Sequence, residues 1–262
     1  MSTLWLIGCG NMAGAMLSRW LDAGMDADRV TIIDPAAART DVRVLRSIPD
    51  EAPPAMLMLG VKPQMLGDVA PGLQAATKGA LLISILAGTT TATLAGMFPQ
   101  SRAVLRVMPN LPVAIGKGVV GLHGALNDND KAAATALMAP LGLVEWIADE
   151  VHFDAVTALS GSGPAFVYRF IDALAQGGAA LGLPADQAAR LALATVEGAG
   201  LLAASSDVSP GELAERVASK GGSTRKGLDV FDANDSLVAL ATVALKAAEQ
   251  RNREMAALTR SG

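Results

Sequence analysis

The chain has 262 residues, of which 51% are hydrophobic and 3% aromatic, and its formal net charge at pH 7 is −4. This length allows one large or two medium domains with a sizeable core. The negative charge argues against a nucleic-acid or acidic-membrane surface. The single cysteine, Cys9, excludes a disulfide within the chain and fits a reducing compartment. We find no signal peptide and no membrane-spanning run, so we expect a cytoplasmic protein.

The first elements predict a nucleotide-binding turn. A short apolar run, Leu4–Ile7, leads into a glycine-rich stretch and then an Ala-rich amphipathic segment at 15–23. This strand, turn and helix fit the pattern G-x-G-x-x-G/A at Gly8, Gly10 and Ala13. Gly8 allows the tight turn, Gly10 lets the backbone approach a pyrophosphate, and Ala13 lets the helix pack against the strand. The pyrophosphate is expected on the helix N-terminus, where free N–H groups favour an anion.

A second strand, Val30–Ile33, ends in Asp34, roughly 20 residues beyond the glycines. A carboxylate at this place accepts hydrogen bonds from a ribose 2′-OH and repels a 2′-phosphate, which favours NADH over NADPH. Two alternatives stay open. Asp34 could instead cap a following helix ahead of Pro35, and Arg39 could reach a 2′-phosphate.

The connection that follows is short. Only 20 residues separate Asp34 from the apolar run Ala55–Val61, too few for two helical crossovers around a strand at 42–45. Prolines at 49, 53 and 54 exclude a helix in the second half. We therefore expect one or both connections to be loops, and the adenosine edge of the pocket to be open.

Three buried strands, at 55–61, 81–86 and 103–107, are followed by small, proline or polar residues. Such endings suit the carboxyl edge of a doubly wound sheet, where ligands bind. For Lys62 and Asn110 a purely structural role, as a solvated lysine and a turn residue, stays open. The residues expected to contact the cofactor at this edge are Gly8, Gly10, Asn11, Met12, Ala13, Asp34, Val61, Lys62, Pro63, Ala87, Gly88 and Asn110.

Two more strands, at 119–122 and 143–147 with a helix at 130–141 between them, would bring the sheet to about eight strands. From about residue 151 the pattern turns helical. The helices are expected at 151–159, 164–181, 184–204, 211–218, 224–231 and 236–258. They are rich in Ala and Gly, and so apolar that we expect one face to be buried against a second subunit.

The sequence therefore predicts an α/β protein in two domains. Residues 1–150 form a doubly wound Rossmann-type sheet that binds a dinucleotide, and residues 151–262 form an all-α dimerisation and substrate domain. The two histidines, His123 and His152, stand in no metal-ligand spacing, so we interpret both as structural and expect no metal site.

One stretch of the helical half, ASKGGSTRKGLDVFD at 218–232, places two glycines between a serine and a threonine ahead of an amphipathic segment. This pattern predicts a helix–loop–helix junction whose backbone N–H groups face an anion. The alternative is an ordinary helix break, in which Gly221 and Gly222 end one helix and Ser223 or Thr224 caps the next.

Six separated motifs stand in a fixed order along the chain. They are IGCGNMAGAM at 7–16, VKPQ at 61–64, SILAGTT at 84–90, RVMPNLPVAIGKG at 106–118, DAVTALSGSGPAFVY at 154–168 and VASKGGSTRKGLDVFD at 217–232. With these motifs the chain resembles the pyrroline-5-carboxylate reductase family over essentially its whole length. The last two motifs are the most specific, whereas the glycine motif alone fits many families.

The resemblance implies an NAD(P)H-dependent oxidoreductase that passes a hydride to the C=N carbon of 1-pyrroline-5-carboxylate and gives proline. It also implies a homodimer of interlocked C-terminal helices that holds the substrate between subunits, often within a larger ring of dimers. By the same resemblance, Ser219, Gly221, Gly222 and Ser223 bind the substrate carboxylate. Thr224 hydrogen-bonds the ring nitrogen as the catalytic residue, and water delivers the proton.

Three features depart from the family pattern. Lys220 stands where a proline is usual, Phe166 stands where a tyrosine is usual, and the short 34–55 region leaves the family's 2′-phosphate contacts open. Other functions remain to be tested: a reductase of a related cyclic imino acid, a 3-hydroxyacid dehydrogenase, or a non-catalytic dinucleotide-binding regulator. The dehydrogenase is disfavoured because no lysine follows Gly161–Gly163 in the next helix, at 164–171.

Overall fold

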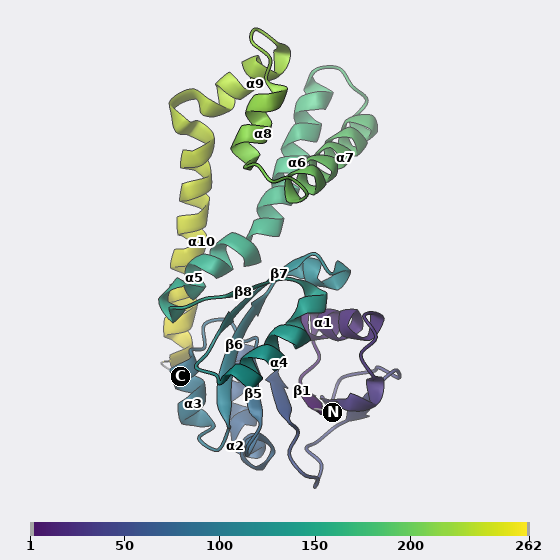
Figure 1. Cartoon of the computed structure of the whole chain (residues 1–262), viewed down its shortest axis with the longest axis vertical. Helices are drawn as coiled ribbons and strands as arrows, with labels where there is room; N and C mark the ends of the chain where they lie inside the picture. The colour runs from purple at the N-terminus through teal and green to yellow at the C-terminus, as the bar shows by residue number, and fades with distance from the viewer. Residues whose placement is uncertain (1–2, 261–262) are drawn as a thin grey trace. The chain divides into compact units, whose positions relative to one another are not determined.

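The computed structural model describes residues 3–260 (Figure 1). The chain divides into two compact units. Unit 1 takes the residues up to Ser162 together with those from Ala248 onward, and unit 2 takes Gly163–Ala247. The domain boundary predicted at residue 151 lies ahead of this division and stays a proposal. Each unit is described by itself.

Unit 1 is built on one eight-stranded sheet. The strands are β1 (Leu4–Ile7), β2 (Val30–Ile33), β3 (Arg43–Leu45), β4 (Met56–Leu59), β5 (Leu81–Ser84), β6 (Ala103–Pro109), β7 (Gly118–His123) and β8 (Gly142–Trp146). Their order is β3-β2-β1-β4-β5-β6-β7-β8. All neighbours run parallel except β6 and β7, which are antiparallel. The predicted doubly wound sheet and its eight strands are confirmed.

Helices cover both faces of this sheet (Figure 1). On one face, α1 (Asn11–Asp22) and α4 (Asp128–Met138) pack over Leu4 and Leu6, and Trp20 of α1 is fully buried in this core. On the other face, α2 (Leu66–Thr77) and α3 (Thr91–Met97) pack over Trp5 and Ile7. Alternate residues of β1 thus enter opposite cores, which explains why the whole strand is apolar.

The connection from β2 to β3 has no helix, as the short spacing predicted: residues 34–42 run as a turn and loop. β3 nevertheless pairs parallel with β2, with Thr31 opposite Arg43. The exposed side chain of Arg43 is paired with Glu51 at 2.5 Å. The alternative in which Asp34 caps a helix ahead of Pro35 is wrong, because no helix begins there.

Unit 2 consists of α6 (Gly163–Ala180), α7 (Ala185–Ala204), α8 (Pro210–Val217), α9 (Ser223–Asp232) and the first part of α10 (Ser236–Arg260). Helices α6 and α7 pack closely through small residues. A Cβ added at Gly178 would lie 3.3 Å from the Cβ of Ala188, which is buried. These helices begin and end within about two residues of the predicted bounds.

The predicted helix at 151–159 is wrong in kind. The segment forms a 3₁₀ turn at Glu150–His152, then a short α5 (Phe153–Val156), then a π-helical turn at Thr157–Gly161. The N–H of Ser162 donates to the carbonyl of Thr157, five residues earlier, at 3.1 Å. This spacing is that of a π turn. The apolar spacing alone does not distinguish these helix types. Among the described residues, none of the helices has the length and apolar character needed to span a membrane.

Candidate active site

The glycine turn after β1 has an open face. Gly8 has φ +82°, and its N–H donates to the carbonyl of Ile33 at 3.0 Å. Gly10 is the N-cap residue of α1, and a Cβ built on it meets nothing within 4 Å. No side chain caps α1, and no acidic residue stands in its first turn. The first N–H groups, in the turn of Asn11–Ala13, therefore remain available to an anion, and the turn fits a pyrophosphate.

Gly60, which the sequence analysis did not single out, lets β4 end against this turn. A Cβ added at Gly60 would lie 2.7 Å from the carbonyl oxygen of Gly8 and 3.0 Å from the Cβ of Ala13. Any other residue would push the two strand ends apart. A glycine at the end of an apolar run was the available signal. Val61, Lys62 and Pro63 follow directly, and the side chain of Lys62 is exposed.

Asp34 braces the glycine turn. Its Oδ2 accepts the N–H of Cys9 and its Oδ1 accepts the N–H of Ala36, each at 2.8 Å. The carboxylate is thus fixed beside the turn, as expected of a ribose acceptor, and each oxygen retains a further lone pair. Burial raises the pKa of the Cys9 thiol. The Arg39 charge opposes this shift, and the Asp34 charge adds to it.

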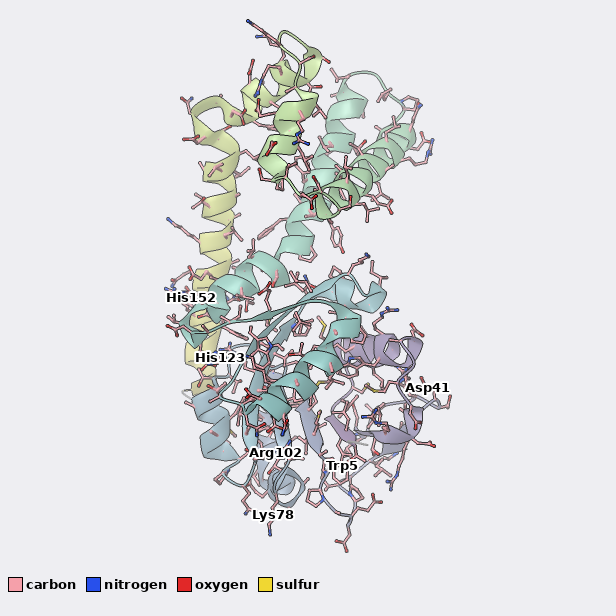
Figure 2. All side chains as sticks on the ribbon, viewed as in Figure 1. Trp5, Asp41, Lys78, Arg102, His123 and His152 are labelled. Atoms are coloured by element: carbon pink, nitrogen blue, oxygen red, sulfur yellow. The ribbon has the colours of Figure 1, made fainter. Side chains whose placement is uncertain are left out.

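Arg39, the alternative contact for a 2′-phosphate, is engaged within unit 1. Its Nε and Nη2 donate to Asp41 at 2.9 and 2.5 Å, and its Nη1 donates to Ser18 of α1 at 2.9 Å. The hydrogen bonds to Asp41 raise the pKa of Arg39. Asp41 lies on the loop beside α1 (Figure 2). A 2′-phosphate would have to compete with Asp41 for this guanidinium.

The loop after β5 carries Ala87 and Gly88, and Gly88 adopts φ +74°. Thr90 caps α3, since its hydroxyl accepts the N–H of Thr93 at 3.2 Å. The hydroxyl of Thr89 is buried and has no hydrogen-bond partner among the described residues. The Thr89 hydroxyl of this loop is therefore left for a ligand or a water molecule to pair with.

Asn110, at the end of β6, uses both ends of its amide. Its Oδ1 accepts the N–H of Val119 at 2.8 Å, and its Nδ2 donates to the carbonyl of Ser160 at 2.9 Å. In a regular helix the Ser160 carbonyl would accept from residue 164, but Pro164 has no N–H. The Asn110 side chain replaces that missing donor.

The turn ahead of α9 in unit 2 is compact. Gly221 has φ +74°, and the N–H of Gly222 donates to the carbonyl of Ser219 at 2.9 Å. A Cβ added at Gly222 would lie 2.5 Å from the Oγ of Ser219. Gly222 is the N-cap residue of α9, so the alternative in which Ser223 or Thr224 caps this helix is wrong.

The consequence is an uncapped helix N-terminus with exposed hydroxyls. No side chain caps α9, its first turn holds no acidic residue, and Ser219, Ser223 and Thr224 are exposed. Arg225 is occupied by Glu215, Asp229 and Asp232 at 2.8, 3.0 and 2.8 Å. The exposed Lys220 forms no ion pair among the described residues. The positive end of the α9 dipole and the charge of Lys220 therefore meet at this turn.

The structure gathers the predicted cofactor residues at the carboxyl ends of β1, β2, β4, β5 and β6, which are neighbours in the sheet. The predicted substrate residues lie together in unit 2. His123 (Figure 2) donates through its Nδ1–H to the carbonyl of Ile147 at 2.8 Å, and its ring meets Phe153 edge-on. His152 is exposed, and the described residues contain no cluster of potential metal ligands.

Comparison with known proteins is decisive. The chain is 37% identical to a pyrroline-5-carboxylate reductase of Pseudomonas aeruginosa, over 95% of both proteins. It is 36% identical to the Glycine max protein of the same name, over 97% of this chain and 96% of that protein. The chain belongs to the pyrroline-5-carboxylate reductase family.

Two family models match separate parts of the chain. Residues 150–255 match the model for pyrroline-5-carboxylate reductase dimerisation, and residues 3–88 match that for coenzyme F420-dependent NADP oxidoreductase. The family's solved structures agree over nearly the whole chain. A Plasmodium falciparum reductase with NADP bound superposes with a TM-score of 0.84 at 27% identity, covering 97% of this chain and 98% of that one.

A Coxiella burnetii pyrroline-5-carboxylate reductase superposes with a TM-score of 0.88 at 28% identity, again covering 97% and 98% of the two chains. The reductase fold, the Rossmann-type unit for a nicotinamide dinucleotide and the dimerisation region are therefore those predicted. Sequence reasoning missed Gly60, and it missed the hydrogen bonds that join Thr91, Arg106 and Glu150. The last three meet across long stretches of chain, and no local pattern joins them.

Proposed function

We propose that this protein reduces 1-pyrroline-5-carboxylate to L-proline by hydride transfer from NAD(P)H to the cyclic C=N bond, the last step of proline biosynthesis. The observation that carries the proposal is the uncapped N-terminus of α9, preceded by the tight Gly221–Gly222 turn. Backbone N–H groups at a helix start bind a carboxylate without any side-chain charge. Membership of the family over the full chain supports the same substrate class.

In this proposal the residues of unit 2 bind and orient. The N–H groups of Gly221 and Ser223, with the hydroxyl of Ser219, hold the substrate carboxylate, while the N–H of Gly222 bonds to the Ser219 carbonyl and fixes the turn around it. The hydroxyl of Thr224 hydrogen-bonds the ring nitrogen and keeps the C=N carbon in a fixed place. A protonated ring nitrogen makes that carbon more electrophilic, and water can supply the proton because the loop is exposed. The nicotinamide, when bound, supplies the hydride, so the chain's part is positioning.

Lys220 adds a cation beside this carboxylate site. Its charge attracts an anionic substrate, more strongly at low salt. It is also the residue through which a related cyclic imino acid could be preferred. Substitution Lys220→Met should therefore change the choice between 1-pyrroline-5-carboxylate and its 2-carboxylate isomer if Lys220 sets specificity. If the ratio of kcat/KM values for the two isomers is unchanged, Lys220 only attracts the anionic substrate and does not set specificity.

For the cofactor we infer a nicotinamide dinucleotide with NADH preferred. The carboxylate of Asp34 is held beside the glycine turn by two N–H donors, which suits a ribose 2′-OH and repels a 2′-phosphate. The guanidinium of Arg39 is occupied by Asp41. A higher kcat/KM with NADPH than with NADH would contradict this preference.

The assembly proposed is a homodimer through the C-terminal helices, and a ring of such dimers in a larger form. Unit 2 leaves many large apolar side chains exposed, more than a soluble monomer carries without a partner. They include Leu191, Leu201, Leu202, Val238, Leu240 and Val243. Light scattering behind a sizing column measures the mass, and a monomer at micromolar concentration would overturn the proposal. The low cysteine content leads us to infer a cytoplasmic location.

The test of the reaction follows oxidation of NADH and of NADPH at the nicotinamide absorbance, with each pyrroline carboxylate isomer in turn. We expect turnover of the 5-carboxylate. Preference for the 2-carboxylate would favour the related imino-acid reductase. Oxidation of a 3-hydroxyacid would favour the dehydrogenase, and tight dinucleotide binding without any turnover would favour the non-catalytic regulator.

A further inference from the structure

Glu150, in the segment that follows β8, reaches the start of α3. Its Oε1 accepts the backbone N–H of Thr91 at 2.9 Å, and its Oε2 accepts the Thr91 hydroxyl at 2.8 Å. One carboxylate thus takes both donors of a single residue, which lies 59 positions earlier in the chain. This bidentate arrangement fixes the start of α3 in direction as well as in place.

Arg106 of β6 fixes the carboxylate in turn. Its Nη1 donates to Oε1 of Glu150 at 2.9 Å, and its guanidinium carbon lies 4.4 Å from the ring centroid of Phe153. Arg106 is 6% exposed, so a buried cation is matched by a mostly buried carboxylate. A hydrogen bond between charged groups that is shielded from water is stronger than one in solvent, so this contact orients the Glu150 carboxylate.

The segment that this network holds is the loop predicted to contact the cofactor. It leaves β5 with the N–H of Ile85 bonded to the carbonyl of Leu59 at 3.2 Å, then passes through Ala87 and Gly88 to Thr91. Helix α3 is 7 residues long, and the residues that bury it in the core, Leu94 and Phe98, stand at its middle and its C-terminal end. Its first residue, at the far end of the loop, therefore needs an anchor of its own. The bonds from Glu150 supply that anchor.

We propose that Glu150, oriented by Arg106, is a positioning residue for the nicotinamide cofactor: it anchors the loop of Ala87 and Gly88 through Thr91. The inference rests on the proposed function, because it takes this loop as a wall of the dinucleotide site. A loop already fixed before binding loses less conformational freedom when the cofactor arrives, which strengthens binding. Glu150 itself touches no reacting atom.

The chain offers a matched control at the other end of β6. Arg102 donates to Asp130 of α4 at 2.7 Å, and its Nη1 donates to the carbonyl of Gly79 at 2.6 Å. Arg102 lies toward Lys78, away from the strand ends that carry the cofactor residues (Figure 2). Asp130 is 7% exposed. Its substitution, like that of Glu150, leaves an arginine beside β6 without its carboxylate partner. The two pairs share their chemistry and differ in what they anchor.

The experiment measures the Kd of the full-length protein for NADH and NADPH, by quenching of protein fluorescence, in four variants. Glu150→Ala should weaken binding about tenfold, the loss of one charge-assisted hydrogen-bond anchor. Glu150→Gln keeps an acceptor for the Thr91 N–H and should stay within about twofold of the unmodified protein. Asp130→Ala should lower the melting temperature and leave Kd unchanged.

Thr91→Val tests the inference if Glu150→Ala does not fold. It removes the hydrogen bond from the Thr91 hydroxyl to Glu150 and should weaken dinucleotide binding about threefold. Hydrogen exchange gives a readout that needs no cofactor. In Glu150→Ala the amides of 88–91 should exchange faster, whereas in Asp130→Ala they should exchange as in the unmodified protein.

Equal Kd values in Thr91→Val, Glu150→Ala and the unmodified protein would overturn the inference, as would equal weakening by Asp130→Ala. Such results leave the proposed reaction standing, because turnover of the unmodified protein is measured separately. Conversely, normal dinucleotide binding without reduction of either pyrroline carboxylate would overturn the proposed reaction and leave the anchor testable. An unmodified protein that binds neither dinucleotide would overturn both.

Discussion

The carboxyl edge of the sheet in unit 1 and the turn ahead of α9 in unit 2 are shaped by bonds of different reach. At the sheet edge, side chains join residues separated by 25 positions (Asp34 to Cys9), 50 (Asn110 to Ser160) and 59 (Glu150 to Thr91). In the turn, the N–H of Gly222 bonds three residues back to Ser219. The first site depends on the assembled fold, whereas the second is built by local backbone geometry.

This difference shows where each site is vulnerable. Substitutions far from the sheet edge in sequence can move the cofactor residues, because their partners come from other strands and loops. The turn should instead be sensitive to changes within its own few residues. Variants in the two regions can therefore separate cofactor binding from the use of substrate.

The largest effect is expected from Gly222→Ala. The added Cβ would lie 2.5 Å from the Oγ and 3.1 Å from the carbonyl oxygen of Ser219, so the Ser219 hydroxyl must rotate out of its place and the turn must shift slightly. We expect kcat/KM for the imine to fall about 100-fold with the dinucleotide Kd unchanged. Steady-state kinetics and fluorescence titration measure the two quantities. Gly227→Ala is the control, because its Cβ meets nothing within 4 Å. An active Gly222→Ala would remove the turn from the substrate site.

Thr224→Ala should come next, with kcat lowered about 30-fold by loss of one hydrogen bond to a charged ring nitrogen. Dinucleotide binding should not change, because Thr224 belongs to unit 2, whereas the residues predicted to contact the dinucleotide belong to unit 1. Thr224→Ser should recover most of the rate, since it keeps the hydroxyl. If Thr224→Ala turns over as fast as the unmodified protein, this residue has no part in the mechanism.

A smaller effect is expected at Asp34. Asp34→Asn removes the negative charge near the ribose while retaining an acceptor for the glycine turn, so NADPH should gain about fivefold relative to NADH. The ratio of kcat/KM values for the two cofactors is the measurement. Asp28→Asn removes an equal charge from the 3₁₀ turn before β2 and should leave the ratio alone. If the ratio does not change in Asp34→Asn, then Arg39 rather than Asp34 determines the cofactor preference.

The smallest effect concerns acid stability. Hydrogen bonds from Arg102 lower the pKa of Asp130. Burial raises the pKa of Glu150, but bonds from Thr91 and Arg106 outweigh burial and leave it lowered. Because both carboxyls have lower pKa values folded than unfolded, their stabilisation is present above about pH 4.5 and is lost as the pH falls further.

Urea unfolding between pH 7 and pH 3 measures this loss as a fall in the free energy of unfolding. In Asp130→Asn the decline with acid should be shallower, because the titrating group is gone. A decline as steep as that of the unmodified protein would show that Asp130 does not contribute to it.

Much of the fold could be predicted from the sequence because its signals are local. The buried strands are short apolar runs, and the glycine turn and the breaks at Gly182 and Pro184 are visible within a few residues. The segment at 151–159 was mistaken for one helix, because hydrophobic spacing does not distinguish π and 3₁₀ turns from an α-helix. Phe153 is buried in either case.

The site could be predicted only where motifs carry it. Gly8, Gly10 and the turn at 219–224 have recognisable spacing, but nothing near Glu150 in sequence points to Thr91 or Arg106. Hydrogen bonds between distant residues depend on the sheet order, which brings β5 and β6 together. Likewise, the need for glycine at Gly60 arises from the backbone of Gly8, which only the assembled sheet reveals.

The helix-free connection between β2 and β3 has a consequence for engineering. In this stretch, residues 34–42 form a turn and loop. Loops of this kind accept changes of length at little cost in closure entropy. Within it, Ala37 and Val42 pack against the core and Asp34 holds the glycine turn, so these three positions should be kept. Libraries that recode this reductase for one dinucleotide or the other should begin with the remaining residues of the loop.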